Sequence, residues 1–151
     1  MGGPRAVMLV AAVVALIGLA DSGYLAVKHL RGDYVRCDDD CSAVLGSVYA
    51  EGVAGVPLAG FGAVAYSVVL VAALLAAIGI RAARSVVALM AILMALISLW
   101  LIYLQAFVIH SFCKYCLLSA AACFTLAVLV FTEWLLRRRA GSGISRIKLR
   151  A

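Results

Sequence analysis

The sequence predicts an all-α membrane protein, a bundle of four transmembrane helices with an extracytoplasmic loop that contains a short amphipathic surface helix. Of the 151 residues, 67% are hydrophobic and only 13% are charged, and the mean hydropathy is +1.15. A soluble domain of this length needs more charged surface than that. The apolar residues also fall into four long runs, with most of the charges between and beyond them. We therefore expect one membrane domain over residues 1–151.

The first predicted span covers residues 6–27. Its length suits a full crossing, which needs roughly 20 residues. Asp21 falls near the far end of the run, where a carboxylate can reach the interface. A cleaved signal peptide that ends at Leu19-Ala20 is the alternative. Because the apolar pattern resumes at Tyr24, we expect the span to be retained.

Residues 28–59 form the long polar loop of the chain. Within it, residues 42–51 carry apolar side chains at the spacing of one helix face, namely Val44, Leu45, Val48 and Tyr49. Such a segment lies along a membrane surface as an interfacial helix. The loop also holds Cys37 and Cys41, and the three aspartates between them disfavour thiolates.

Three further spans are predicted at residues 60–80, 85–109 and 116–136. Small residues at the start of the second span allow the close approach of another helix, namely Gly60, Gly62 and Ala63. The basic residues at 81–84 predict a tight turn between the second and third spans. A basic tail at 137–151 is expected to anchor the topology or to contact anionic lipid.

Lysines and arginines predict the orientation, because they concentrate on the cytoplasmic side of membrane proteins. Nine of the 13 lie at the N-terminus, in the turn between the second and third spans, and in the tail. These are Arg5, Arg81, Arg84, Arg137, Arg138, Arg139, Arg146, Lys148 and Arg150. Both termini are therefore expected in the cytoplasm, with the loop cysteines outside. The basic residues flank apolar runs rather than form a patch with interleaved aromatics, so no nucleic-acid partner is expected.

The fourth span opens on a Cys-x-x-Cys motif, Cys113 to Cys116. Two sulfurs one helical turn apart can close into an exchangeable disulfide, and a helix N-terminus favours a thiolate. The predicted topology places Cys37 and Cys41 on the same, oxidising side, so two pairs could exchange electrons there. Cys123, about two turns further on, is expected to be a small buried hydrophobe.

The residues leave other interpretations of these four cysteines open. Their spacing also fits a tetrahedral four-cysteine zinc site, although thiols on the oxidising side tend to be oxidised. They could instead form inert disulfides that staple loops. In either case the chain would be a non-catalytic four-span membrane scaffold, whereas a dithiol relay would make it an enzyme.

The order of these elements resembles the vitamin K epoxide reductase family, and its bacterial branch most closely. The resemblance rests on four spans, the loop cysteine pair, Ser47, Pro57, residues 60–62, Tyr66 and the run 112–120, and covers residues 6–136. The other four-helix disulfide oxidase family of bacteria carries its Cys-x-x-Cys motif in the first external loop. Here the motif opens the last helix, as in vitamin K epoxide reductases.

The resemblance implies a quinone-linked thiol oxidoreductase and a role for each cysteine. Cys116 would lie deepest, next to a quinone of the ubiquinone, menaquinone or phylloquinone type, with Cys113 as its disulfide partner. Cys41 would attack the Cys113–Cys116 disulfide, and Cys37 would receive electrons from a reduced partner. Many bacterial members carry a fused thioredoxin-like domain. Because this chain ends in a basic tail, its thioredoxin-fold partner is expected to be a separate extracytoplasmic protein.

The resemblance also implies a quinone pocket. Ser47 matches a family serine on the surface helix that covers this pocket, and the wall and proton-donor candidates are Phe61, Phe107, Tyr115 and His110. Animal members hold the ring carbonyls with an asparagine and a tyrosine, where this chain has Leu58 and Ala120. The missing donors favour quinone reduction over epoxide reduction or binding of coumarin-type drugs.

Overall fold

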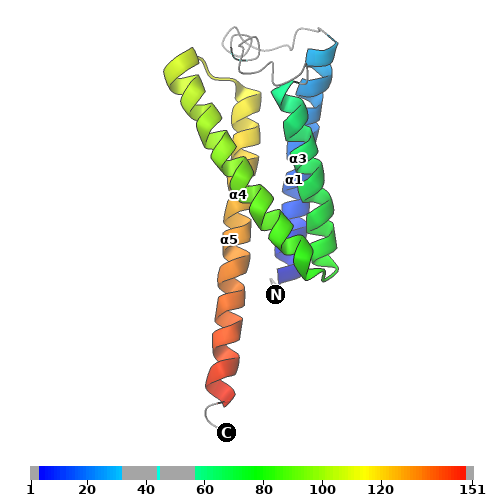
Figure 1. The fold of residues 1–151 in the computed structure, drawn as a ribbon, viewed down its shortest axis with the longest axis vertical. Helices are drawn as coiled ribbons and strands as arrows, with labels where there is room; N and C mark the ends of the chain where they lie inside the picture. The colour runs from blue at the N-terminus through cyan, green and yellow to red at the C-terminus, as the bar shows by residue number, and fades with distance from the viewer. Residues whose placement is uncertain (1–3, 32–43, 45–56, 149–151) are drawn as a thin grey trace.

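The computed structural model describes residues 4–31, 44 and 57–148, and these ranges are almost entirely helical (Figure 1). Its helices are α1 (Pro4–Leu30), α3 (Leu58–Ala77), α4 (Arg81–Leu104) and α5 (Lys114–Lys148), and a π-helical turn, η1 (Gln105–Ile109), continues α4. Four helical segments in the described part of the chain are long and apolar enough to cross a membrane. The predicted all-α, four-helix fold class is thereby confirmed.

The helices form two pairs that are joined along the bundle. Helices α1 and α3 lie side by side, while α4 runs diagonally across α5 (Figure 1). Further contacts of α1 with α5 and of α3 with α4 hold the two pairs together. The link from η1 to α5 lies at the same end of the bundle as the start of α3, so the Cys-x-x-Cys motif is at that end.

The turn between α3 and α4 differs from the prediction. Residues 81–84 were predicted to form it, but they make the first turn of α4, and the chain reverses at residues 78–80 instead. Gly79 has a φ of +112°, a conformation that glycine adopts without a side-chain clash. The Ile80 N–H also donates to the Leu75 carbonyl at 3.1 Å. This bond helps to close the end of α3, whose last residue, Ala77, lies four residues before Arg81.

Helix α5 also continues past the predicted end of the fourth span, through residues 137–148 of the predicted tail. The segment opens with three arginines and an alanine, which have high helix propensity, and it contains no proline. The helix therefore extends beyond the apolar part of its sequence.

Helices α1 and α3 approach closely because small residues line their contact. A Cβ atom at Gly18 would overlap the ring of Tyr66, which is 1% exposed. One turn on, a Cβ at Gly62 would lie 3.5 Å from the Cβ of Ser22. The Ser22 hydroxyl donates to the Gly18 carbonyl at 2.6 Å, which satisfies the buried hydroxyl inside its own helix. Gly62 therefore faces α1, but a side chain there would make only an ordinary van der Waals contact, so the close approach depends on Gly18.

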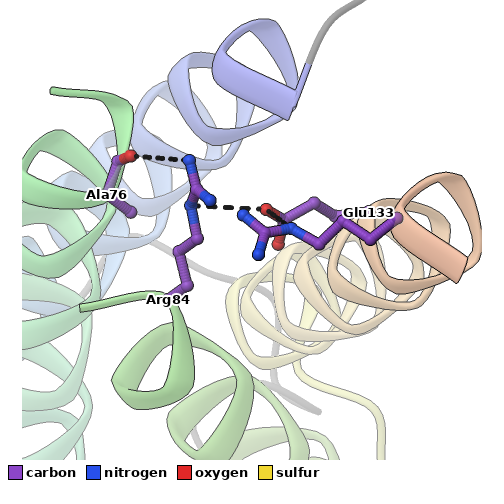
Figure 2. A network of polar contacts seen from close by, with 4 residues as sticks. Ala76, Arg84 and Glu133 are labelled. Carbon is purple, nitrogen blue, oxygen red and sulfur yellow. Dashed lines mark hydrogen bonds and ion pairs between the residues drawn. The ribbon is translucent and has the colours of Figure 1, made fainter. Parts of the chain in front are cut away.

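Polar contacts connect three helices near the start of α4 (Figure 2). The Arg84 guanidinium donates from Nη2 to the Ala76 carbonyl of α3 at 3.3 Å. Its Nε lies 3.5 Å from Oε1 of Glu133 on α5, a residue that is 6% exposed. The same carboxylate oxygen accepts from Nε of Arg137 at 3.0 Å. Arg84 therefore joins α4 to both α3 and α5 at the end remote from the cysteine motif.

Replacing Gly18 by alanine is expected to lower the melting temperature in detergent. The new Cβ forces the Tyr66 ring to move, and such overpacking costs roughly 1–3 kcal/mol. Gly23→Ala is the matched control, because its Cβ meets nothing within 4 Å. There the better helix propensity of alanine should stabilise the helix by about 0.5–1 kcal/mol. Equal stabilisation in both variants would contradict the close approach at Gly18.

Replacing Glu133 by alanine is expected to destabilise the bundle by up to about 3 kcal/mol, because it leaves the half-buried Arg84 guanidinium without its anion. Arg137→Ala breaks a contact to the same carboxylate, but the Arg137 side chain is 43% exposed. Its loss should cost about 0.5 kcal/mol. Thermal unfolding of both variants checks this order, and a larger effect at Arg137 would refute it.

Candidate functional site

The Cys-x-x-Cys motif lies at the junction of η1 and α5, and Cys113 is the N-cap residue of α5. The Leu117 N–H donates to the Cys113 carbonyl at 3.0 Å, which makes the first bond of the helix. The Cys116 N–H donates to Sγ of Cys113 at 3.4 Å. This is the contact that serine and aspartate side chains make at helix N-termini. The helix thus begins two residues before Cys116, and its positive end faces the Cys113 sulfur.

Burial differs between the two sulfur-bearing residues. Cys113 is fully buried, whereas Cys116 is partly exposed. Cys113 packs with Val44 of the loop, and Ile109, Tyr115 and Cys116 pack against this pair. Val44, which was predicted to lie on the apolar face of the surface helix, therefore packs on Cys113 and helps to bury it.

Helix α1 passes close to the motif through Asp21 and Tyr24. The rings of Tyr24 and Tyr115 lie 6.1 Å apart between centroids, at an interplanar angle of 38°. One turn before Tyr24, Asp21 interacts electrostatically with Cys113. Its Oδ2 atom is buried and has no hydrogen-bond partner among the described residues. A negative charge at Asp21 opposes ionisation of the Cys113 sulfur, whereas the helix end favours it.

A hydrogen-bonded cluster lies one to two turns further along α5. The Tyr66 hydroxyl donates to the Ser119 carbonyl at 2.8 Å and lies 3.1 Å from both the Ser119 hydroxyl and Sγ of Cys123. Cys116, Ser119 and Cys123 are three and four residues apart, so they share one face of α5. Cys123 is buried, as predicted, but its sulfur also takes part in this cluster.

The polar partners of the motif were not predicted from the sequence. Gln105 stands alone in an uncharged span, yet its Oε1 accepts from the Cys113 N–H at 3.2 Å. Tyr66 was noted only as part of a family pattern. The one sequence signal for Gln105 was a lone amide in an apolar span, eight residues before the cysteine motif. Its contact with Cys113 could not be predicted, because it depends on η1 turning the chain back.

Only some of the other predicted site residues lie near the cysteine motif. Of the predicted pocket residues, Tyr115 packs with the cysteines, whereas His110, Phe61 and Phe107 are exposed. The Phe107 ring contacts the exposed ring of Tyr103 in a tilted arrangement, with centroids 5.0 Å apart and an interplanar angle of 32°. The remaining predicted site residues, Cys37, Cys41 and Ser47, lie outside the described residues.

Within residues 4–31, 44 and 57–148, no three histidine, cysteine, aspartate or glutamate side chains come together in a way that could hold a metal ion. The alternative zinc site needs Cys37 and Cys41, which lie outside these ranges. It therefore remains an alternative.

Comparison with known proteins agrees with this geometry. The sequence pattern of the vitamin K epoxide reductase family matches residues 9–131, a range that includes both cysteine pairs and most of each membrane-crossing helix. The chain belongs to the vitamin K epoxide reductase family. No individual curated protein matches it.

Membership of the vitamin K epoxide reductase family implies oxidoreductase chemistry that links disulfides to a quinone. Together with the four apolar helices, it makes the chain an integral, multi-pass membrane protein. The residues around the motif fit such chemistry, because a partly exposed cysteine stands among apolar side chains beside a buried one.

Asp21→Asn is expected to increase the thiolate fraction of Cys113, because it removes a negative charge that opposes the ionised sulfur. In a chain whose other four cysteines are alanine, a small thiol reagent should then modify Cys113 roughly three- to tenfold faster at pH 7. Glu133→Gln is the control, since it removes a buried carboxylate near the far end of the bundle. Unchanged rates in Asp21→Asn would disprove the interaction.

Proposed function

We propose that this protein is a quinone-linked thiol oxidoreductase that reoxidises a separate extracytoplasmic thioredoxin-fold protein and so supports disulfide-bond formation. The observation that carries the proposal is the position of the two cysteines. Cys113 caps α5 with its sulfur against the Cys116 N–H, and Cys116 is partly exposed one turn away. A thiolate at a helix N-terminus beside a second thiol is the arrangement that favours disulfide exchange.

Electrons enter through the loop pair in this proposal. A thiolate of the reduced partner attacks Cys37 of the Cys37–Cys41 disulfide, and Cys41 leaves as a thiolate. Cys41 then attacks the Cys113–Cys116 disulfide at Cys113 and releases the Cys116 thiolate. The partner's second thiolate then attacks the partner–Cys37 mixed disulfide, so that the partner leaves as its own disulfide and Cys37 is freed as a thiolate. Cys37 attacks the Cys41–Cys113 mixed disulfide at Cys41, which re-forms the Cys37–Cys41 disulfide and releases the Cys113 thiolate.

The position of Val44 supports the second exchange. Val44 is 6% exposed and packs on Cys113. Cys41 precedes it by three residues, and three residues of extended chain reach roughly 10 Å. This chain length is compatible with the proposed attack of Cys41 on Cys113.

The acceptor in this proposal is a quinone of the ubiquinone, menaquinone or phylloquinone type. When bound, it would accept two electrons and two protons and become the hydroquinone as Cys113 and Cys116 return to the disulfide. Cys116 would face it, and Tyr115 and Ile109 would exclude water from the exchange. Leu58 and Ala120 offer no side-chain donor to its carbonyls, which supports quinone reduction over epoxide chemistry.

The proposed sidedness follows from the lysines and arginines. Both termini would lie in the cytoplasm and the four cysteines on the extracytoplasmic side, because most basic residues flank the other ends of the spans. The link from η1 to α5, which carries the cysteine motif, lies at the opposite end of the bundle from the turn between α3 and α4 (Figure 1), in line with this topology.

Quinone reduction by the purified chain, supplied with a reduced thioredoxin-fold donor, tests the proposal. Cys116→Ala should reduce turnover to the uncatalysed rate, because the thiolate that passes electrons to the quinone is then missing. Cys123→Ala should keep most of the activity, since that sulfur lies two turns from the motif. Absence of turnover with all three quinone types in folded wild-type protein would favour a non-catalytic scaffold instead.

A further inference from the structure

The first residue of η1 holds the backbone of the segment that carries the cysteine motif. The carbonyl of Gln105 accepts from the His110 N–H and, at 3.2 Å, from the Ser111 N–H. Its side-chain Oε1 accepts from the Cys113 N–H, also at 3.2 Å. Three of the four N–H groups between η1 and α5 therefore end on Gln105, which is 3% exposed.

The π-helical turn makes this arrangement possible. In η1 the hydrogen bond from His110 reaches back five residues to Gln105, one more than in an α-helix. His110 then adopts a left-handed conformation, with a φ of 55°, which is uncommon for a residue with a Cβ. The wide turn and the reversal bring the chain back over Gln105, so that its side chain meets Cys113.

Fixing the backbone of Cys113 also fixes its sulfur. The Cys113 Sγ atom lies 3.4 Å from the Cys116 backbone nitrogen, and the bond from the Cys113 N–H to Gln105 holds the backbone from which this side chain extends. There the sulfur receives both the hydrogen bond and the positive end of α5, which stabilise a thiolate. Gln105 accepts a hydrogen bond without a charge of its own, so it adds nothing that opposes this thiolate.

We propose that Gln105 is a positioning residue for Cys113, whose side-chain oxygen keeps the Cys113 sulfur at the N-terminal end of α5. The inference rests on the proposed function, in which Cys113 and Cys116 alternate between disulfide and dithiol. Because the helix end stabilises the reduced form, Gln105 makes the pair a stronger oxidant. It therefore favours uptake of electrons from the loop pair.

The equilibrium of this pair with dithiothreitol measures that effect directly. Two electrons and two protons pass from reduced dithiothreitol to the Cys113–Cys116 disulfide, which gives oxidised dithiothreitol and two thiols, with a proton released wherever a thiolate is stable. The full chain would carry alanine at Cys37, Cys41 and Cys123. Acid quenching followed by alkylation after denaturation counts the reduced fraction, whatever the burial of each sulfur.

Gln105→Met keeps the length of the side chain and removes the acceptor. We expect the equilibrium constant for reduction to fall roughly three- to tenfold at pH 7, because the thiolate loses part of its stabilisation at the helix end. Ser98→Ala is the matched control, since Ser98 is also a buried polar residue, 8% exposed and two turns earlier, on α4. Its constant should stay within about twofold of the parent.

Melting temperatures of the same variants separate positioning from packing. A Gln105→Met protein that melts earlier but keeps the parent equilibrium constant would overturn the proposal, because Gln105 would then only fill space. If this variant does not fold, Gln105→Asn retains the amide but is one methylene too short, and the same fall is expected. A parent pair that never forms a disulfide would overturn the proposed function as well, whereas a normal parent equilibrium with no quinone turnover would overturn the proposed function alone.

Discussion

The contact between Tyr66 and Gly18 is the constraint on which the rest of the bundle depends. The phenol ring occupies the space that a side chain at Gly18 would need, so α1 and α3 meet at the ring itself. The hydroxyl then reaches Ser119 and Cys123 on α5. In an apolar solvent a buried hydroxyl must find such partners within the protein. One side chain thereby connects three helices directly below the cysteine motif.

Two opposing influences meet at Cys113. The N-terminal end of α5 and the Cys116 N–H favour a negative sulfur, while the carboxylate of Asp21 opposes it. A disulfide exchanges fastest when its thiols are neither too stable as thiolates nor too reluctant to ionise. The balance suits a cysteine that must accept a sulfur from one partner and return it to another. Helices α1 and α5 set this balance, and Gln105 of η1 holds the Cys113 backbone between them.

Hydropathy and spacing are local properties, and they were sufficient for the fold class, the four spans and the Cys-x-x-Cys motif. Packing is not local. The π-helical turn that brings Gln105 to Cys113 and the fit of Tyr66 on Gly18 depend on residues far apart in the sequence. The exposed position of Phe107 beside Tyr103 could not be predicted either. In a span that is apolar on all sides, periodicity does not reveal which face of the helix points outward. The roles of Cys37, Cys41 and Ser47 stay predictions.

The far end of α5 determines how deep the cysteine motif lies in a bilayer. The Arg138 guanidinium stacks 3.8 Å from the centre of the Trp134 ring, a pairing suited to the headgroup level, where aromatic rings and arginines gather. At about 1.5 Å per residue, the helix from Arg138 back to Cys116 measures roughly 33 Å. The hydrocarbon layer is about 30 Å thick. The length of α5 therefore places the motif at the opposite headgroup boundary, which is accessible both to proteins in water and to molecules dissolved in the lipid.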